Sequence, residues 1–217
     1  MRREKLVILG GTGSGIIVAD AARASTRAFD VIGFLNDGVP RGSDFSGIPV
    51  LGNFAAWQDC PAEARFISAF PKAKEAFARF ARLVSLGIPD DRWATVIHPA
   101  AHVASDARLG LGSFVGAAAV VEPGVVGGKH VCIRGGSYVS HDVRLGDYTF
   151  IGPNATILGR STIGEGAHVA ANAVCREETA IGKYAVLGIG AVSLAEVPDF
   201  TVVAGNPARV ISRLRHP

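Results

Sequence analysis

Hydrophobic positions between Val103 and Ser193 recur every six residues. Thirteen of the sixteen positions in this series are branched aliphatics, the exceptions being Gly127, Cys175 and Ser193. Four residues after each of the first fifteen comes Ala, Ser, Thr or Val. A period of six fits neither an α-helix nor a long two-sided strand, but it fits short strands joined by equivalent turns. The pattern therefore predicts a parallel β-helix with the aliphatic series inside and the small series at crowded corners.

The same period predicts which residues lie above one another. Three hexapeptides make one triangular coil, so residues that are 18 positions apart in the sequence stack at about 4.8 Å. This rule places Gly159 directly above His141.

The first 95 residues lack this period and alternate strand-like with helix-like segments. Residues 5–9 and 30–38 read as strands, and a glycine turn followed by a helix-compatible stretch lies between them. Residues 71–87 have helical spacing with an apolar side, formed by Phe77, Phe80, Ala81, Leu83 and Val84. We expect a small Rossmann-like α/β domain with four or five strands, large enough to bind one nucleotide. The expected divisions are residues 1–95 for this domain, 96–195 for the solenoid and 196–217 for a tail.

The glycine turn suggests how a nucleotide would bind. Gly11 and Gly13 would let backbone N–H groups at a helix start approach a phosphate, and Asn36 or Asp37 would hold the ribose or base. Ile16 stands where a dinucleotide fingerprint has its third glycine, so a purely structural strand, turn and helix is the alternative explanation.

Composition narrows the possible partners and the compartment. A net charge of +3 without a basic cluster argues against nucleic-acid binding. Three widely spaced cysteines indicate neither disulfides nor a metal site, and they favour a reducing, cytoplasmic location. The apolar start is interrupted by glycines and reads as part of the fold rather than as a signal peptide. There is no long apolar run, so we expect no membrane span.

An ionisable pair, His141 and Asp142, interrupts the monotonous solenoid sequence. Acyl transfer needs a base for the nucleophile and a donor for the oxyanion. His141 suits the first role, with Asp142 orienting it, and the Gly159 N–H suits the second. The alternative is a solvated turn histidine beside an incidental aspartate.

The other five histidines have weaker chemical contexts. His130 is expected at the surface, and His98 is expected to be structural. His102 and His168 precede inward aliphatics and should point outward, while His216 lies in the tail. If His141 were not the base, His168 and His130 would be the next candidates.

Several motifs occur together along almost the whole chain: "GFLNDG", "GIPVLG", "TVIHPAAHVA", "VSHDVRLGD" and "VVAGNPARVI". In this combination the chain resembles the sialic-acid O-acetyltransferase/bacillosamine and perosamine N-acetyltransferase family. The resemblance implies a left-handed β-helix, a homotrimer with active sites between subunits, and acetyl-CoA-dependent N-acetylation of a nucleotide-linked amino sugar without a metal. It also implies His141 as the general base, Gly159 as the acetyl contact, and a coenzyme A site towards the C-terminal coils with Gly188, Asn206, Pro207 and Arg209.

The sequence departs from the family at two positions near the expected acceptor. Arg134, which we expect among the sugar-nucleotide contacts, stands where the family often has asparagine, and Phe150 stands where a second histidine is frequent. These departures favour, as one alternative, a non-catalytic nucleotide-sugar sensor or scaffold. Two further alternatives are an O-acetyltransferase and a zinc-dependent carbonic anhydrase on the same solenoid, which would need three histidines converging between subunits.

Overall fold

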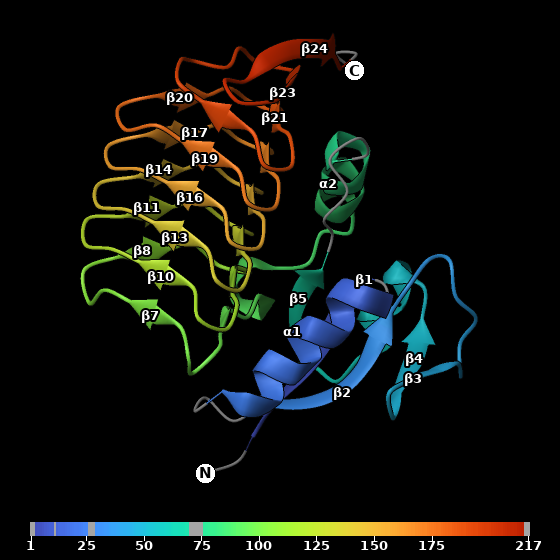
Figure 1. The fold of residues 1–217 in the computed structure, drawn as a ribbon. Coiled ribbons are helices and arrows are strands. Elements are labelled where there is room, and N and C mark those ends of the chain that lie inside the picture. The colour runs from blue at the N-terminus through green and yellow to red at the C-terminus, as the bar shows by residue number, and fades with distance from the viewer. Residues whose placement is uncertain (1–2, 11, 26–28, 70–75, 215–217) are drawn as a thin grey trace.

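The computed structural model describes residues 3–10, 12–25, 29–69 and 76–214, which form an α/β unit and a solenoid (Figure 1). The α/β unit and the segment that links it to the solenoid contain the following elements: β1 (Glu4–Gly10), α1 (Thr12–Ala24), β2 (Phe29–Leu35), β3 (Asp44–Phe45), β4 (Ile48–Gly52), the 3-10 helix η1 (Phe54–Asp59), β5 (Arg65–Ala69), α2 (Ala76–Ser85) and the 3-10 helix η3 (Asp90–Arg92).

The five strands of the α/β unit form one sheet in the order β3-β4-β2-β1-β5. All pairings are parallel except that of β3 with β4. Buried aliphatics fill β1, and the end of β2 is buried as well, at Gly33, Phe34 and Leu35, as expected for strands covered on both faces. Because Leu9 pairs with Leu35, the glycine turn after β1 lies next to the end of β2 that leads into Asn36.

The solenoid consists of short parallel strands in three sheets. Sheet I contains β6 (Val96–Ile97), β9 (Phe114–Val115), β12 (Cys132–Ile133), β15 (Phe150–Ile151), β18 (His168–Val169), β21 (Val186–Leu187), β23 (Thr201–Ala204) and the antiparallel edge strand β24 (Arg209–Arg213). Sheet II contains β7 (His102–Val103), β10 (Val120–Val121), β13 (Tyr138–Val139), β16 (Thr156–Ile157), β19 (Val174–Cys175) and β22 (Val192–Ser193). Sheet III contains β8 (Arg108–Leu109), β11 (Val126–Gly127), β14 (Arg144–Leu145), β17 (Thr162–Ile163) and β20 (Ala180–Ile181). The turns between successive sheets are called corners I–II, II–III and III–I.

The predicted burial of the aliphatic series and of the small series is confirmed inside the solenoid. The aliphatic series is buried from Val115 to Leu187, and the small series is buried from Ser113 to Ala191. Val103 and Leu109 are only partly buried, because β7 and β8 are edge strands with no coil beyond them. Strands pair with the strand one coil away, for example Tyr138 with Val120, so the predicted stacking interval is correct.

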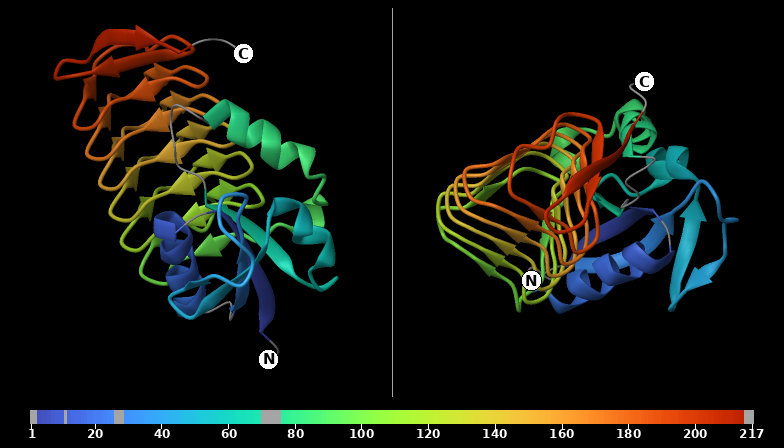
Figure 2. Two further views of the ribbon diagram at one scale, coloured as in Figure 1. Left: turned by 90° about the vertical axis from the view of Figure 1, so that its right-hand side faces the viewer. Right: turned by 45° about the horizontal axis from the view of Figure 1, so that its top comes forward.

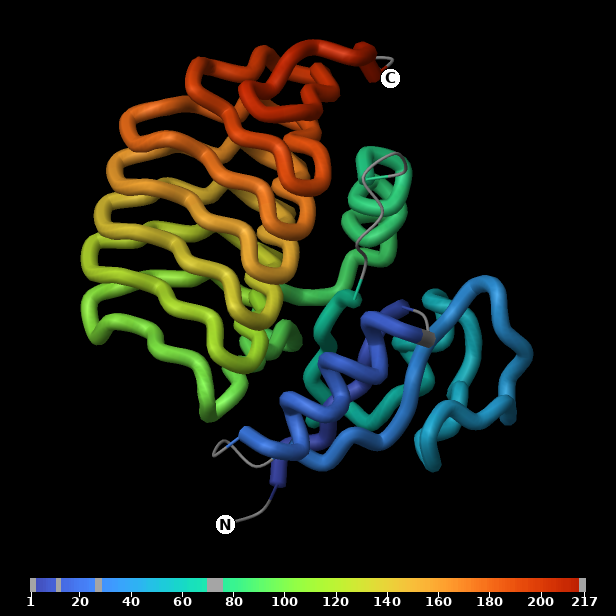
Figure 3. Tube along the Cα trace, in the orientation of Figure 1, coloured from blue at the N-terminus to red at the C-terminus, as the bar shows by residue number. Residues whose placement is uncertain are grey.

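Sheet I carries the joint with the α/β unit. Phe114 is buried in the same cluster as Leu6, Ile8 and Phe34 of the α/β unit, and Cys132 packs against that cluster. Figure 2 shows α1 beside the lower coils. Figure 3 shows the C-terminus at the far end of the solenoid from the N-terminus. The joint therefore fixes the α/β unit against one face of the β-helix.

The helix α2 ends at Ser85, two residues before the predicted end, and its predicted apolar side is partly wrong. Residues 71–75 of the expected helix lie outside the described residues. Phe80 stacks on Tyr148 at 4.5 Å between ring centroids, and Leu83 is buried. Ala81 is exposed, however, and Val84 is 64% exposed. The reason is that α2 packs on a narrow corner of the solenoid, which covers only a thin strip of the helix.

Candidate active site

His141 and Asp142 form the turn between β13 and β14, at the II–III corner. Asp142 has a φ of 59°, a left-handed conformation that aspartate tolerates better than most residues. Its carboxylate turns back onto the neighbouring ring, and Asp142 Oδ2 lies 2.9 Å from His141 Nδ1. The two side chains are 48% and 61% exposed. When Nδ1 carries the proton and donates it to Asp142, Nε2 presents its lone pair to an incoming group.

Gly159 lies one coil above the histidine, as the stacking rule predicts. The Arg160 N–H donates to the His141 carbonyl at 3.0 Å, which fixes the two turns against each other. A Cβ atom at Gly159 would lie 2.7 Å from His141 Nε2, so only glycine leaves room for the imidazole. Within the part of the chain that the structure describes, no hydrogen bond uses the Gly159 N–H. This N–H is thus a donor next to the histidine nitrogen that can act as a base.

Two other histidines lie in apolar surroundings. The prediction that His130 is a surface residue is wrong: its ring stacks on Tyr148 and meets Trp93 edge-on. Burial lowers the pKa of His130 to about 4. His168 stacks on Phe150 at 4.4 Å between ring centroids, and burial lowers its pKa to about 4 as well. Both rings are therefore neutral and weakly basic at pH 7, which makes them poor general bases.

The glycines of the turn after β1 differ in how closely other atoms approach them. A Cβ at Gly10 would lie 2.8 Å from the Ala69 carbonyl oxygen, and one at Gly15 would lie 3.0 Å from the Phe34 ring. Those two glycines are therefore required by packing. Gly13 is exposed and has nothing within 4 Å of the position of a Cβ. Gly11 lies outside the described residues.

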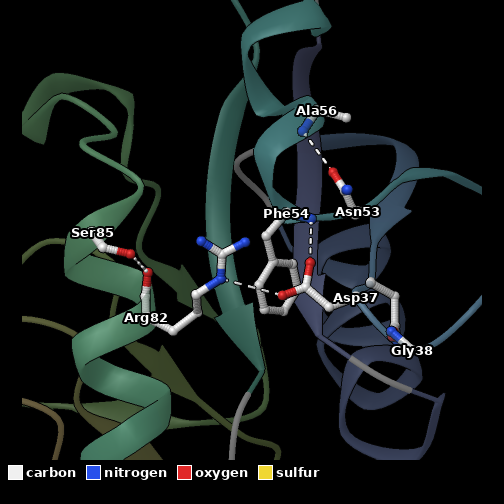
Figure 4. Close-up of polar contacts among 8 residues, drawn as sticks. Asp37, Gly38, Asn53, Phe54, Ala56, Arg82 and Ser85 are labelled. Atoms are coloured by element: carbon white, nitrogen blue, oxygen red, sulfur yellow. Dashed lines mark hydrogen bonds and ion pairs between the residues drawn. The ribbon is translucent and has the colours of Figure 1, made fainter.

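Asn36 and Asp37 are both engaged within their own chain. The Asn36 amide donates to the Gly10 carbonyl at 3.0 Å and accepts from the Gly38 N–H at 2.9 Å. Asp37 Oδ1 accepts from the Phe54 N–H at 2.7 Å, as Figure 4 shows. Asp37 Oδ2 lies 3.4 Å from Arg82 Nε of α2. The hydrogen bonds made by Asn36 shape the glycine turn, and Asp37 connects η1 to α2.

Arg134 follows β12 and reaches the α/β unit across the joint. It is only 9% exposed, and its Nη1 lies 3.5 Å from Ser14 Oγ near the start of α1. Ser14 is not among the residues predicted for the site. The only available signal was its place in the glycine-rich turn.

The expected coenzyme A residues lie at the end of the solenoid. Gly188 lies at the I–II corner, where its N–H donates to the Val203 carbonyl at 2.8 Å. Asn206, Pro207 and Arg209 are exposed in and just after the turn between β23 and β24. A cavity of about 330 Å³ at this end is lined in part by Pro207, Arg209 and Leu194.

The candidate residues thus form separate groups. His141, Asp142 and Gly159 come together at the II–III corner, whereas Arg134 and Gly188 lie at the I–II corner on the other side of sheet II. In Figure 1 the turn from β13 to β14 lies on the side of the solenoid away from α1 and α2. Among the described residues, no cluster of His, Cys, Asp and Glu suits a metal ion, and no helix is long and apolar enough to cross a membrane.

Comparisons with known proteins agree with this architecture. Residues 142–177 match the family model "Bacterial transferase hexapeptide (six repeats)". A search of curated proteins gave no match. Among solved structures, the acetyltransferase domain of PglB from Neisseria gonorrhoeae FA1090, in complex with acetyl coenzyme A, is 31% identical. The match has a TM-score of 0.85 and covers 97% of this chain and 100% of that one.

The second group of similar structures is perosamine N-acetyltransferase from Caulobacter crescentus. That enzyme, in complex with CoA and GDP-perosamine, is 25% identical, with a TM-score of 0.83 and coverage of 96% of this chain and 97% of that one. A histidine-to-asparagine variant of it, with the same two ligands, matches with a TM-score of 0.84 at 25% identity over the same shares of the two chains. The predicted left-handed β-helix following an α/β domain is confirmed by these matches.

Proposed function

Because this chain belongs to the hexapeptide-repeat sugar acetyltransferases that include the PglB acetyltransferase domain, we propose that it acetylates the amine of a nucleotide-linked amino sugar. The chain is an acetyl-CoA-dependent sugar N-acetyltransferase of the PglB and perosamine N-acetyltransferase type. The proposal adds the nucleotide-linked acceptor and the residues that carry out the transfer.

The observation that carries the proposal is the geometry around His141. Its Nδ1 is held by Asp142 at 2.9 Å, and its Nε2 lies against Gly159. We assign Nε2 as the base that removes a proton from the sugar amine as this nitrogen attacks the thioester carbonyl. The Gly159 N–H donates to the oxygen that becomes negative in the tetrahedral intermediate. When that intermediate collapses, the carbon–sulfur bond breaks, the imidazolium returns the proton to the CoA thiolate, and an amide remains.

Direct transfer without an acyl-enzyme is supported by the state of the cysteines. Burial raises the pKa of the Cys132 thiol and of the Cys175 thiol to about 11. Burial also raises the pKa of Cys60. A thiol needs its thiolate form to be a nucleophile, so at neutral pH these three residues are poor acyl carriers.

Residues 1–95 are proposed to bind the nucleotide sugar. Gly13 is the exposed position through which the start of α1 would be approached, and Gly11 comes two residues before it in the sequence. Asn36 and Asp37 are proposed to lie at the rim of this site. Their described hydrogen bonds are made within their own chain and shape the loop. Residues 96–195 would carry the transfer chemistry.

Coenzyme A is proposed to run towards the C-terminal coils. Gly188, Asn206, Pro207 and Arg209 lie there, and residues 196–217 would contribute to the site as a tail. Arg209 offers an exposed guanidinium for a phosphate group of the coenzyme.

The separation of the candidate groups supports a homotrimer with active sites between copies. The turn between β13 and β14, which contains His141, lies on the side of the solenoid away from α1 and α2 of the same chain (Figure 1). One copy is therefore proposed to supply the base, and its neighbour to supply the bound acceptor.

The test is a panel of UDP-, dTDP- and GDP-linked amino sugars with acetyl-CoA, followed by free-thiol release. We expect turnover of at least one nucleotide sugar and much weaker turnover of the corresponding free amino sugar. Equal turnover with and without the nucleotide contradicts the acceptor assignment. Transfer only to sugar hydroxyls would indicate an O-acetyltransferase, and acetyl-CoA binding without turnover of any sugar would indicate a non-catalytic protein.

A further inference from the structure

The turns of the II–III corner are joined by a column of backbone hydrogen bonds that passes through the peptide between His141 and Asp142. In this column the N–H of a turn residue donates to a carbonyl of the coil below, each time at 3.0 Å: Glu178 to Gly159, Arg160 to His141, and Asp142 to Pro123. The N–H groups of the column therefore all point down the solenoid. Hydrogen bonds in such a chain polarise one another, so a fixed lower end stabilises the bonds above it.

The lowest N–H of this column donates to a side chain instead of a backbone carbonyl. By the same interval the Gly124 N–H would reach the Ser105 carbonyl, but it donates to Asp106 Oδ2 at 3.1 Å. The Gly124 N–H and the Pro123 carbonyl belong to one peptide group, and in a trans peptide these two groups point in opposite directions. Asp106 therefore holds the peptide whose carbonyl accepts the Asp142 N–H.

Asp142 uses its carboxylate differently from Asp147, the aspartate in the next turn along the chain. Asp147 Oδ1 accepts from a backbone N–H of the coil below at 2.8 Å. The Asp142 carboxylate also lies over the coil below, with its Cγ 3.4 Å from the position of a Cβ atom on Gly124. The Gly124 N–H is already bound by Asp106. The Asp142 carboxylate pairs with His141 Nδ1 instead.

We infer that Asp106 is a positioning residue for the acetyl transfer, although it lies two coils below His141. It acts through the Pro123–Gly124 peptide on Asp142, and the inference rests on the proposed role of His141 as the base. While Asp106 binds the Gly124 N–H, the Asp142 carboxylate is left to orient the imidazole. Without Asp106 the peptide can turn over, since glycine adopts the backbone conformations on both sides of such a flip. The Gly124 N–H would then point up and compete with His141 for the carboxylate.

The experiment compares Asp106→Ala, which removes the acceptor, with Asp106→Asn, which keeps an acceptor oxygen. The control Asp147→Ala removes the similar hydrogen bond to the Lys129 N–H at the III–I corner. In Asp106→Ala we expect kcat to fall about 3- to 10-fold, the factor that corresponds to one ordinary hydrogen bond. The KM values for the nucleotide sugar and for acetyl-CoA should stay the same. Asp106→Asn should retain most of the wild-type kcat, and Asp147→Ala should retain all of it.

A double-mutant cycle shows whether Asp106 acts through Asp142. In an Asp142→Asn background, replacing Asp106 by Ala should change kcat by less than about twofold, because the group to be positioned is already gone. Asp106→Ala and Asp147→Ala should lower the Tm by similar, small amounts, since each loses one hydrogen bond at an exposed turn.

The tautomer of His141 gives a readout that needs no substrate. Ring nitrogen chemical shifts of histidine-labelled protein distinguish the two neutral tautomers, and the spectrum of His141→Asn identifies the signals of this residue. In the wild type we expect the form with the proton on Nδ1, because Asp142 accepts it. In Asp106→Ala the form with the proton on Nε2 should increase.

The outcomes separate this inference from the proposed function. An unchanged kcat or an unchanged tautomer in Asp106→Ala would overturn the inference even if nucleotide sugars are acetylated. An equal loss of kcat in Asp147→Ala or in Asp106→Asn would overturn it as well, as would a loss that persists in full in the Asp142→Asn background. A tautomer that shifts in Asp106→Ala, in a protein that acetylates no sugar, would support the positioning role and reject the proposed function.

Discussion

A substitution of His141 should change the catalytic activity without changing the stability of the fold. His141→Asn keeps a polar side chain of similar size but removes the base, so kcat/KM should fall about 10²- to 10⁴-fold. Asp142→Asn should cost less, because it disturbs the orientation of the ring without deleting it. The half-exposed turn leaves the Tm almost unchanged. Thiol release at pH 7.5 measures the effect, with His102→Asn as the control; retention of more than about a tenth of kcat/KM would exclude His141 as the base.

Gly159 offers a second test of the same geometry. In Gly159→Ala the added methyl group would lie 2.7 Å from His141 Nε2 and 2.8 Å from Cε1, so the ring must move. We expect kcat to fall at least tenfold while the KM for the nucleotide sugar changes little, because the α/β unit is untouched. The Tm should stay close to that of the wild type, since the displaced group is an exposed side chain. An unchanged kcat would mean that the imidazole does not act from this position.

Single residues also mark the limit of what the sequence could predict. Counting three repeats upward from His141 located Gly159 correctly, because coils of equal length stack in register. The partners of Asn36 and Asp37 could not be counted in this way, because Phe54 and Arg82 come from η1 and α2. For His130, the stacking rule does point to Tyr148, but the edge-on contact with Trp93 could not be counted, because Trp93 belongs to the linker before the solenoid.

Among the elements, those governed by the repeat were predicted best. Every solenoid strand from β7 to β22 begins one residue before a position of the six-residue series. Each such strand needs only its own repeat and the coils next to it. The helix α2 depends instead on Tyr148 and Tyr184, two aromatic residues of the solenoid that meet Phe80 and Phe77. Helical spacing identified the helix, but it could not show that a narrow corner would cover only part of its apolar side.

The packing of aromatic rings on the solenoid predicts a dependence of stability on pH. His130 and His168 have pKa values lowered by burial to about 4 in the folded protein, against about 6.5 when unfolded. The unfolded chain therefore binds more protons between these values, and the stability falls as the pH drops from about 6.5 to 4. His168→Phe keeps a ring against Phe150 and should flatten this slope, whereas His102→Asn should keep it. Melting curves across this range measure the effect, and equal slopes in the wild type and His168→Phe would contradict it.

On the scale of the whole molecule, the solenoid keeps the α/β unit and the turn that contains His141 apart. Sheet I holds the α/β unit through Phe114 and Cys132, and His141 stands at the II–III corner on another side of the triangle. The rigid pairing of successive coils leaves no described hinge in the solenoid that could bring these two sides together. In the proposed homotrimer, a neighbouring copy would do so without any change of fold, by bringing its II–III corner to the α/β unit of the first copy.

Mixing two inactive variants tests this arrangement. His141→Asn lacks the base, and Gly13→Glu places a carboxylate at the exposed start of α1, where it repels a phosphate and meets no described neighbour. When the two variants are co-expressed in equal amounts, a site between copies is intact if one neighbour supplies His141 and the other supplies Gly13. Each neighbour is drawn at random from two variants, so about a quarter of wild-type activity should return. The variants purified separately and assayed together without subunit exchange are the control. If each chain builds its own complete site, co-expression cannot restore turnover, because every chain then carries one of the two lesions.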